Sequence, residues 1–146
     1  MTNFEMIERM NAHAPPALKL LGGKVVSFDE KGGIVEMHFA VGESLCHSGD
    51  IVQGGFLAGM LDAAMTHAVF AVLKDFVIVA SLEIKVSFLE IARPGTIVGR
   101  GWITRMGKTI SFLEGELTNS DGVVLARSSS TARIIHRTPG QRAKSD

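Results

Sequence analysis

Residues 53–73 read QGGFLAGMLDAAMTHAVFAVL, an apolar run in which Asp62 is the single charged side chain. The run is rich in Ala, Leu, Met and Phe, which favours a helix covered on nearly all sides. It is about long enough to cross a bilayer, but a carboxylate at the centre of a membrane helix costs roughly 2.5–3.5 kcal/mol. We therefore predict a buried helix without a membrane span, with Ser48 or Asp50 as its N-cap.

Strand patterns flank this helix on both sides. Before it, residues 20–28 and 34–41 are two predicted strands joined by a tight turn. After it, residues 81–88 alternate between polar and apolar side chains, as a half-buried strand does. Three further strands follow, joined by short turns, at 96–105, 109–117 and 123–135. Because parallel strands need long crossovers, these short connections predict an antiparallel sheet.

The element order predicts an α+β fold in which a curved antiparallel sheet of five to six strands wraps one long central helix. We expect residues 1–20 to form an N-terminal helix and lead-in, residues 21–135 to form a single domain, and residues 136–146 to form a flexible polar tail. One helix cannot cover the whole sheet, so a second subunit is expected to cover the exposed face or the sheet edges.

The charge balance restricts the range of partners. Fifteen Lys and Arg residues balance fifteen Asp and Glu residues, and 46% of the 146 residues are hydrophobic. No excess of basic charge is present to bind nucleic acid or an anionic membrane, and a neutral apolar surface favours a homo-oligomer. The single cysteine excludes an internal disulfide, and the N-terminus lacks the pattern of a secretory signal, so the cytoplasm is the expected compartment.

A motif at the start of the helix carries a family resemblance. Residues 53–64, QGGFLAGMLDAA, resemble the helix-opening motif of the hotdog-fold thioesterases, and among them the PaaI-like (phenylacetic acid degradation type) acyl-CoA thioesterases. In that pattern two glycines follow a His or Gln, and an Asp stands nine positions after it, as Asp62 does after Gln53. The resemblance covers roughly residues 21–133. It implies the hotdog fold, acyl-CoA as substrate, and no cofactor beyond the CoA part of that substrate.

Thioester hydrolysis needs a polarised carbonyl and either an activated water or an attacking carboxylate. A helix N-terminus offers free N–H groups to a developing oxyanion, and the resemblance assigns this role to the backbone of Gly54. By the same resemblance Gln53 orients the thioester, and Ser81 stands where the family often places a hydroxyl that holds the water. Asp62 is then the general base or nucleophile. The alternative role for Asp62 is a structural hydrogen bond. The alternative for Ser81 is an ordinary polar residue on the polar face of a strand.

The spacing of Gly54 and Asp62 bears on the assembly. Eight residues along one helix separate the two groups by about 12 Å, whereas a general base must come within roughly 2.6–3.2 Å of its proton or act through one water. If both residues act, they come from different subunits. The sequence therefore predicts a dimer with the active site at its interface. As a separate expectation, two such dimers form the larger assembly.

The resemblance also suggests residues that contact the substrate. His47 stands where relatives frequently carry Asn, Gly55 follows the oxyanion donor, and three cations occupy turns that in relatives lie near the phosphates of CoA: Arg93, Arg105 and Lys108. For the histidine and the cations, the ordinary alternative is a solvated loop or turn residue. No two histidines have metal-ligand spacing, so no metal is expected.

Two other functions compete with the thioesterase. A hotdog dehydratase or hydratase would use a histidine at the helix opening, where Gln53 stands. A non-catalytic acyl-CoA-binding or regulatory protein would account for the loop 46–50, which departs from the family pattern at His47. Asp62 argues against the binding protein, because a pure binder needs no buried base.

Overall fold

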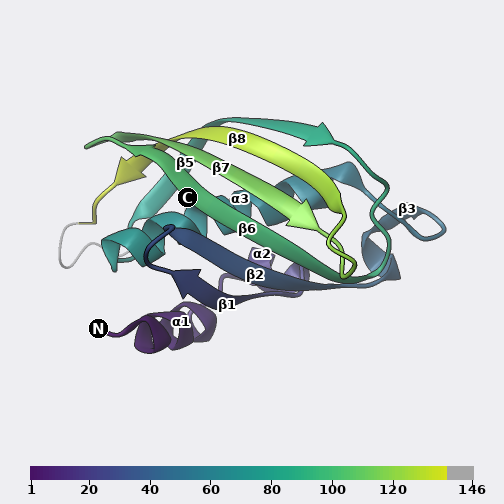
Figure 1. The fold of residues 1–146 in the computed structure, drawn as a ribbon, viewed down its shortest axis with the longest axis horizontal. Helices are drawn as coiled ribbons and strands as arrows, with labels where there is room; N and C mark the ends of the chain where they lie inside the picture. Colours follow the sequence, from purple (N-terminus) through teal and green to yellow (C-terminus); the bar gives the residue numbers. More distant parts are fainter. Residues whose placement is uncertain (138–146) are drawn as a thin grey trace.

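The apolar run forms helix α3 (Gly54–Leu73), which lies across the inner face of one large antiparallel sheet. Figure 1 shows the computed structural model, with α3 behind the sheet and the N-terminal helix α1 below it. The structure describes residues 1–137, so the predicted tail lies outside the described residues from 138 onward. Along its length α3 buries Leu57, Met60, Leu61, Ala64, Met65, His67, Ala68, Val69 and Ala71.

Six strands form the sheet, in the order β1-β2-β6-β7-β8-β5, and every neighbouring pair is antiparallel. Their bounds are β1 Gly23–Asp29, β2 Ile34–Val41, β5 Ile78–Phe88, β6 Gly95–Met106, β7 Ile110–Thr118 and β8 Val124–Ile135. This architecture confirms the predicted curved sheet around one helix. The strand next to α3 in sequence, β5, lies at an edge of the sheet beside the last strand, β8.

Two short helices precede the sheet. Helix α1 (Asn3–Ala12) begins with a capping box between Thr2 and Glu5, and the amide of Asn11 exchanges two hydrogen bonds of 2.8 and 2.9 Å with the backbone of Val25. The second helix, α2 (Pro16–Leu20), occupies residues that the sequence assigned to a lead-in and to the start of a strand. The predicted strand therefore begins at residue 23, not 20, because proline at the first helical position favours a new helical turn.

The predicted N-cap of α3 was wrong. Strands β3 (Cys46–Ser48) and β4 (Ile51–Val52) form a small hairpin that places Ser48 and Asp50 before the helix, away from its first turn. Gln53 is the N-cap, and its side chain makes no capping hydrogen bond. A short polar segment is equally suited to a hairpin turn and to a cap, and here strand pairing decides between them.

Glycine brings the helix close to the sheet. A Cβ atom on Gly101 of β6 would overlap the carbonyl of Ala64 and would lie 2.6 Å from the backbone nitrogen of Met65. The backbone of α3 therefore rests directly on β6 at this point. A larger residue at position 101 would push the helix, and every side chain on it, away from the sheet.

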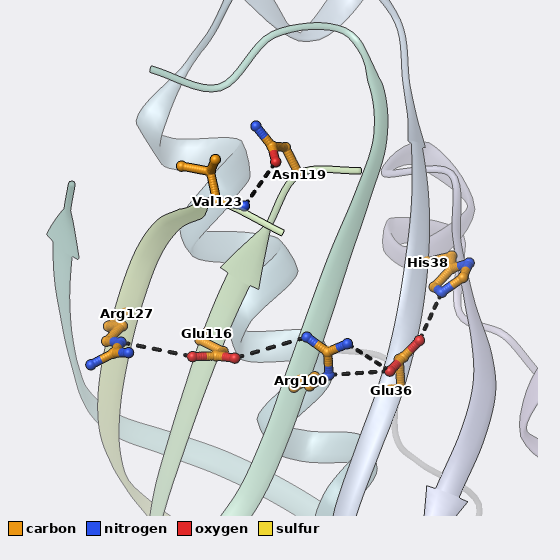
Figure 2. Close-up of polar contacts among 7 residues, drawn as sticks. All are labelled: Glu36, His38, Arg100, Glu116, Asn119, Val123 and Arg127. Atoms are coloured by element: carbon orange, nitrogen blue, oxygen red, sulfur yellow. Dashed lines mark hydrogen bonds and ion pairs between the residues drawn. The ribbon is translucent and has the colours of Figure 1, made fainter. Parts of the chain in front are cut away.

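The outer face of the sheet carries a row of charges that the sequence analysis did not identify (Figure 2). Glu36, Arg100, Glu116 and Arg127 are direct neighbours on β2, β6, β7 and β8, and adjacent members form ion pairs of 3.0, 3.8 and 3.7 Å. Burial raises the pKa of Glu36, but the hydrogen bond with His38 and the charge of Arg100 outweigh it and hold that pKa below its ordinary value. The row links four neighbouring strands on the solvent side of the sheet.

Candidate active site

Asp62 faces the edge strand β5. It is half-buried, in contrast to the fully buried carboxylate that the helix composition predicted, because it lies on the flank of α3 and its neighbours Leu61 and Ala64 face the sheet. The hydroxyl of Ser81 donates a 2.7 Å hydrogen bond to Asp62 Oδ1. The structure thus brings together two of the predicted catalytic side chains, which lie 19 residues apart in the sequence.

A β-bulge aims Ser81 at the helix. Strict alternation along β5 would put Ser81 on the same face as Glu83, the outer one, away from α3. Instead the register shifts at Leu82, so that Ser81 pairs with buried Ala132 and Glu83 pairs with Thr131. The extra residue moves Ser81 to the inner face, which is the known effect of a bulge. The uniform alternation predicted for residues 81–88 was therefore wrong at its first step.

The N-terminus of α3 opens on an apolar groove. Gln53 is exposed, and its carbonyl accepts from the backbone N–H groups of Phe56 and Leu57. The N–H groups of Gly54 and Gly55 precede the first intrahelical hydrogen bonds and have no acceptor within the helix. The groove has a volume of about 350 Å³ and is lined by Ile51, Val52, Gly54, Leu57, Phe88, Leu89, Glu90, Ile91 and Ala92.

Phe88 lines the groove next to Gly54, and the sequence analysis did not assign it to the site. A Cβ atom on Gly54 would lie 3.1 Å from the ring of Phe88, whereas one on Gly55 would meet open space. Gly54 therefore leaves the helix N-terminus accessible beside the ring, and Gly55 has no such contact. The signal for Phe88 in the sequence is weak, because it ends a strand whose apolar positions were expected to be half-buried.

Within one chain, the predicted oxyanion donor Gly54 and the predicted base Asp62 do not meet. Gly54 and Asp62 belong to one continuous helix, so the separation of about 12 Å holds. Phe88, Leu89 and Ile91, next to the groove, are each more than half exposed, as is Leu82 at the bulge. Such a cluster of exposed apolar side chains along an edge strand is typical of an interaction surface.

Two of the predicted substrate-contacting residues, Arg93 and His47, lie beside the groove, on the turn before β6 and on the hairpin β3–β4. Arg93 forms a 2.6 Å ion pair with Asp50, and both are exposed. His47 is exposed and shares a 2.8 Å hydrogen bond with Ser48. These contacts tie the hairpin β3–β4 and the turn before β6 into a single exposed surface.

Arg105 and Lys108 do not join Asp62 within one chain. Arg105 pairs with Phe112, which is exposed on the outer face, and it lines a hollow there together with Glu83. Lys108 is exposed in the turn between β6 and β7. Within residues 1–137, no three His, Cys, Asp or Glu side chains gather as metal ligands.

The model of the thioesterase superfamily matches residues 49–126, which is more than half of the chain and includes α3, β5 and β6. The chain belongs to the thioesterase superfamily. The match contains Asp62, Ser81 and Gly54, and it ends within β8.

Individual relatives agree with this assignment. A solved protein of Ralstonia eutropha JMP134, described as a "putative thioesterase, phenylacetic acid degradation-related protein", is 30% identical with a TM-score of 0.80, over 90% of this chain and 99% of that one. The PaaI protein of the phenylacetic acid degradation operon of E. coli has the same fold, at 20% identity and a TM-score of 0.79 over 94% and 99% of the two chains. A "putative esterase" of Saccharolobus solfataricus is 26% identical over 85% of this chain and 86% of its own. These relatives and the superfamily support thioester hydrolysis as the general activity of this hotdog-fold, PaaI-like protein.

Proposed function

We propose that the protein is an acyl-CoA thioesterase that hydrolyses small or medium acyl- or aryl-CoA, with Asp62 as general base. The observation that carries this proposal is the 2.7 Å hydrogen bond from Ser81 to Asp62 Oδ1. It leaves Oδ2 of the carboxylate able to accept a proton, and the Ser81 oxygen able to accept a hydrogen bond from the same water. A water held by both groups is oriented and activated for attack.

The reaction then balances without a further reactant. Water loses a proton to Asp62 and adds to the thioester carbonyl, whose oxygen becomes negative and is stabilised by the N–H of Gly54. The C–S bond breaks, and the departing thiolate takes the proton from Asp62, giving a carboxylic acid and CoA. Direct attack by Asp62 on the carbonyl is the other route open to the same carboxylate.

The proposal requires two copies of the chain. Because Gly54 and Asp62 lie about 12 Å apart on one helix, the Gly54 that faces a given Asp62 must belong to a second copy. The edge strand β5, with Leu82 and Phe88 exposed, is the surface that supports such a contact. We propose a homodimer through β5, and a dimer of dimers beyond it.

The remaining predicted groups complete the proposal. Gln53 would orient the thioester, while His47 and Gly55 would line the approach to it. Three cations would contact the phosphates of CoA: Arg93, Arg105 and Lys108. No cofactor other than the CoA moiety would be needed, and the protein would act in the cytoplasm.

Thiol release from a panel of acyl-CoAs, from aromatic to long-chain, tests the activity and names the acyl class. We expect the wild-type protein to hydrolyse part of the panel and Asp62→Asn to release no thiol above background. Asp121→Asn, which changes an exposed carboxylate in the β7–β8 turn, is the matched control and should retain full activity. A folded wild-type dimer that binds acyl-CoA without releasing thiol would favour the non-catalytic binding protein.

A further inference from the structure

A second cavity lies on the opposite flank of α3 from Asp62. It has a volume of about 400 Å³ and is lined by residues of α1 and the turn after it, the C-terminal part of α3, the segment before β5 and the chain just after β8. The residues that define its chemistry are Arg9, His13, His67, Phe70, Phe76 and Arg137. The proposed hydrolysis uses none of them.

Aromatic rings form a connected wall of the cavity. His67 meets Phe70 edge-on at 5.4 Å between ring centroids, Phe70 meets Phe76 at 5.5 Å, and His13 meets Phe76 at 6.2 Å. Rings at these distances and tilts attract one another and also offer edges and faces to a further ring. The wall therefore suits a flat aromatic group better than a flexible alkyl chain.

His67 supplies a hydrogen-bond acceptor. Only 5% of its surface is exposed, and its Nδ1 lies 2.7 Å from the carbonyl oxygen of Ala63. Because a carbonyl only accepts, Nδ1 carries the proton, and Nε2 of the neutral ring keeps its lone pair. Within residues 1–137, Nε2 has no hydrogen-bond partner. A ligand atom that donates, such as a hydroxyl, would match it.

Two guanidinium groups supply positive charge. Arg9 lies over the ring of Phe76, with 4.9 Å from Cζ to the ring centroid, and Arg137 lines the same cavity. Neither arginine pairs with a carboxylate in the described part of the chain, and no Asp or Glu of that part lines the cavity. Stacking leaves the edge of a guanidinium free to bind a carboxylate.

We propose that this cavity is a binding site for a small aromatic carboxylate that carries a hydroxyl group. The ring packs against Phe70 and Phe76, the carboxylate binds Arg9 and Arg137, and the hydroxyl donates to His67. No lining residue is common to this cavity and the groove at the N-terminus of α3.

The cavity and the proposed catalytic site lie on different sides of helix α3. His67 follows Asp62 by five residues, which turns it by about 140° around the helix axis. In addition, Arg9, His13 and Arg137 lie outside residues 49–126, the part that the superfamily model matches. The cavity is thus built largely by the two ends of the described chain.

Isothermal titration with 3-(4-hydroxyphenyl)propanoate tests the proposal on the full-length protein. We expect one saturable site with a Kd on the order of 1 mM or tighter for a ligand of this size. The uncharged amide of the same compound and the analogue that lacks the phenol hydroxyl should each bind several-fold more weakly. These two analogues test the arginines and His67 without any change to the protein.

Variants locate the site. Arg9→Gln combined with Arg137→Gln should weaken binding about tenfold or more by removing charge-assisted hydrogen bonds, while Arg133→Gln, an exposed arginine of β8 outside the cavity, should not change it. Asp62→Asn should bind as the wild type does. Binding that the double variant leaves unchanged, or that Asp62→Asn abolishes, would overturn the proposal, as would equal affinity for the acid and its amide.

Discussion

The two flanks of helix α3 differ in what covers them. On one flank Asp62 meets Ser81 of an edge strand, and the apolar side chains around it are exposed. On the other flank His67 is buried beneath an aromatic cluster that reaches α1. The chain closes the second flank with its own N-terminal helix and leaves the first open.

The two flanks also differ in the hydrogen bonds that their polar side chains form. The carboxylate of Asp62 binds a hydroxyl from another element, so a change at either partner alters the other. The ring of His67 binds the carbonyl of Ala63 one helical turn earlier, so its orientation is set within α3. The open flank, with the Asp62–Ser81 pair accessible, is suited to a reaction on a bound substrate. The closed flank, where the ring of His67 is held in place, is suited to ligand binding and to stability.

The largest effect on activity should come from replacing Asp62, the charged residue on the open flank. Asp62→Asn should lower kcat for acyl-CoA hydrolysis by roughly 10²–10⁴, the usual worth of a general base, while far-ultraviolet circular dichroism stays unchanged. His67→Gln, five residues further along the same helix, should leave kcat nearly unaltered. Comparable losses in the two variants would remove the functional distinction between the flanks.

A second change should disturb both flanks together. Gly101→Ala would force a methyl group against the backbone of α3 at Ala64, and we expect it to lower the free energy of unfolding by roughly 3 kcal/mol. Gly42→Ala, where a Cβ meets open space, is the control for loss of a glycine. Urea denaturation measures both. An unchanged midpoint in Gly101→Ala would show that the helix does not rest on β6 as closely as described.

The hydroxyl on the open flank should have a smaller effect. Ser81→Ala removes one hydrogen bond to a charged group, and a roughly tenfold fall in kcat is expected with little change in stability. Ser81→Thr, which keeps the hydroxyl, should restore much of the activity. Ser87→Ala, at an outward-facing position of β5 beside Arg127, should behave as the wild type. A fully active Ser81→Ala would leave Asp62 to act without this partner.

The smallest predicted effect is a pH dependence of the free energy of unfolding that comes from His67 on the closed flank. Burial lowers the pKa of His67 below its ordinary value of 6.5, so the unfolded chain takes up this proton at a higher pH than the folded one. The free energy of unfolding should therefore fall as the pH drops below about 6.5, by at most about 1.4 kcal/mol per pH unit from this group. The hydrogen bond between the ring of His67 and the carbonyl of Ala63 acts in the opposite direction on this pKa, but the effect of burial is larger.

Denaturation at pH 7.5 and at pH 5.0 measures that slope. His67→Gln should remove the contribution of His67, and His47→Gln, an exposed histidine, should leave the slope as it is. The same pH dependence in His67→Gln and wild type would assign it to other groups.

The sequence alone determined the N-terminal helix α1, the long helix α3, the six strands of the main sheet and the order of these elements, but not α2 or the hairpin β3–β4. The apolar composition of residues 53–73 predicted α3, the short turns predicted antiparallel strands, and the interval between Gly54 and Asp62 predicted that the two cannot meet within one chain. These features depend on local composition and spacing, and the rise and twist of a helix or strand convert spacing directly into geometry.

Only the tertiary structure decided which distant residues meet. The bulge at Leu82 that turns Ser81 inward, the ion pair of Arg93 with Asp50, and the charge row from Glu36 to Arg127 all depend on strand register. Register is set by packing across the whole sheet, and a shift of one residue moves a side chain to the opposite face. The cavity around His67 likewise exists because Arg9 and His13 contact Phe76, just beyond the end of α3, and these residues are more than fifty positions apart in the sequence.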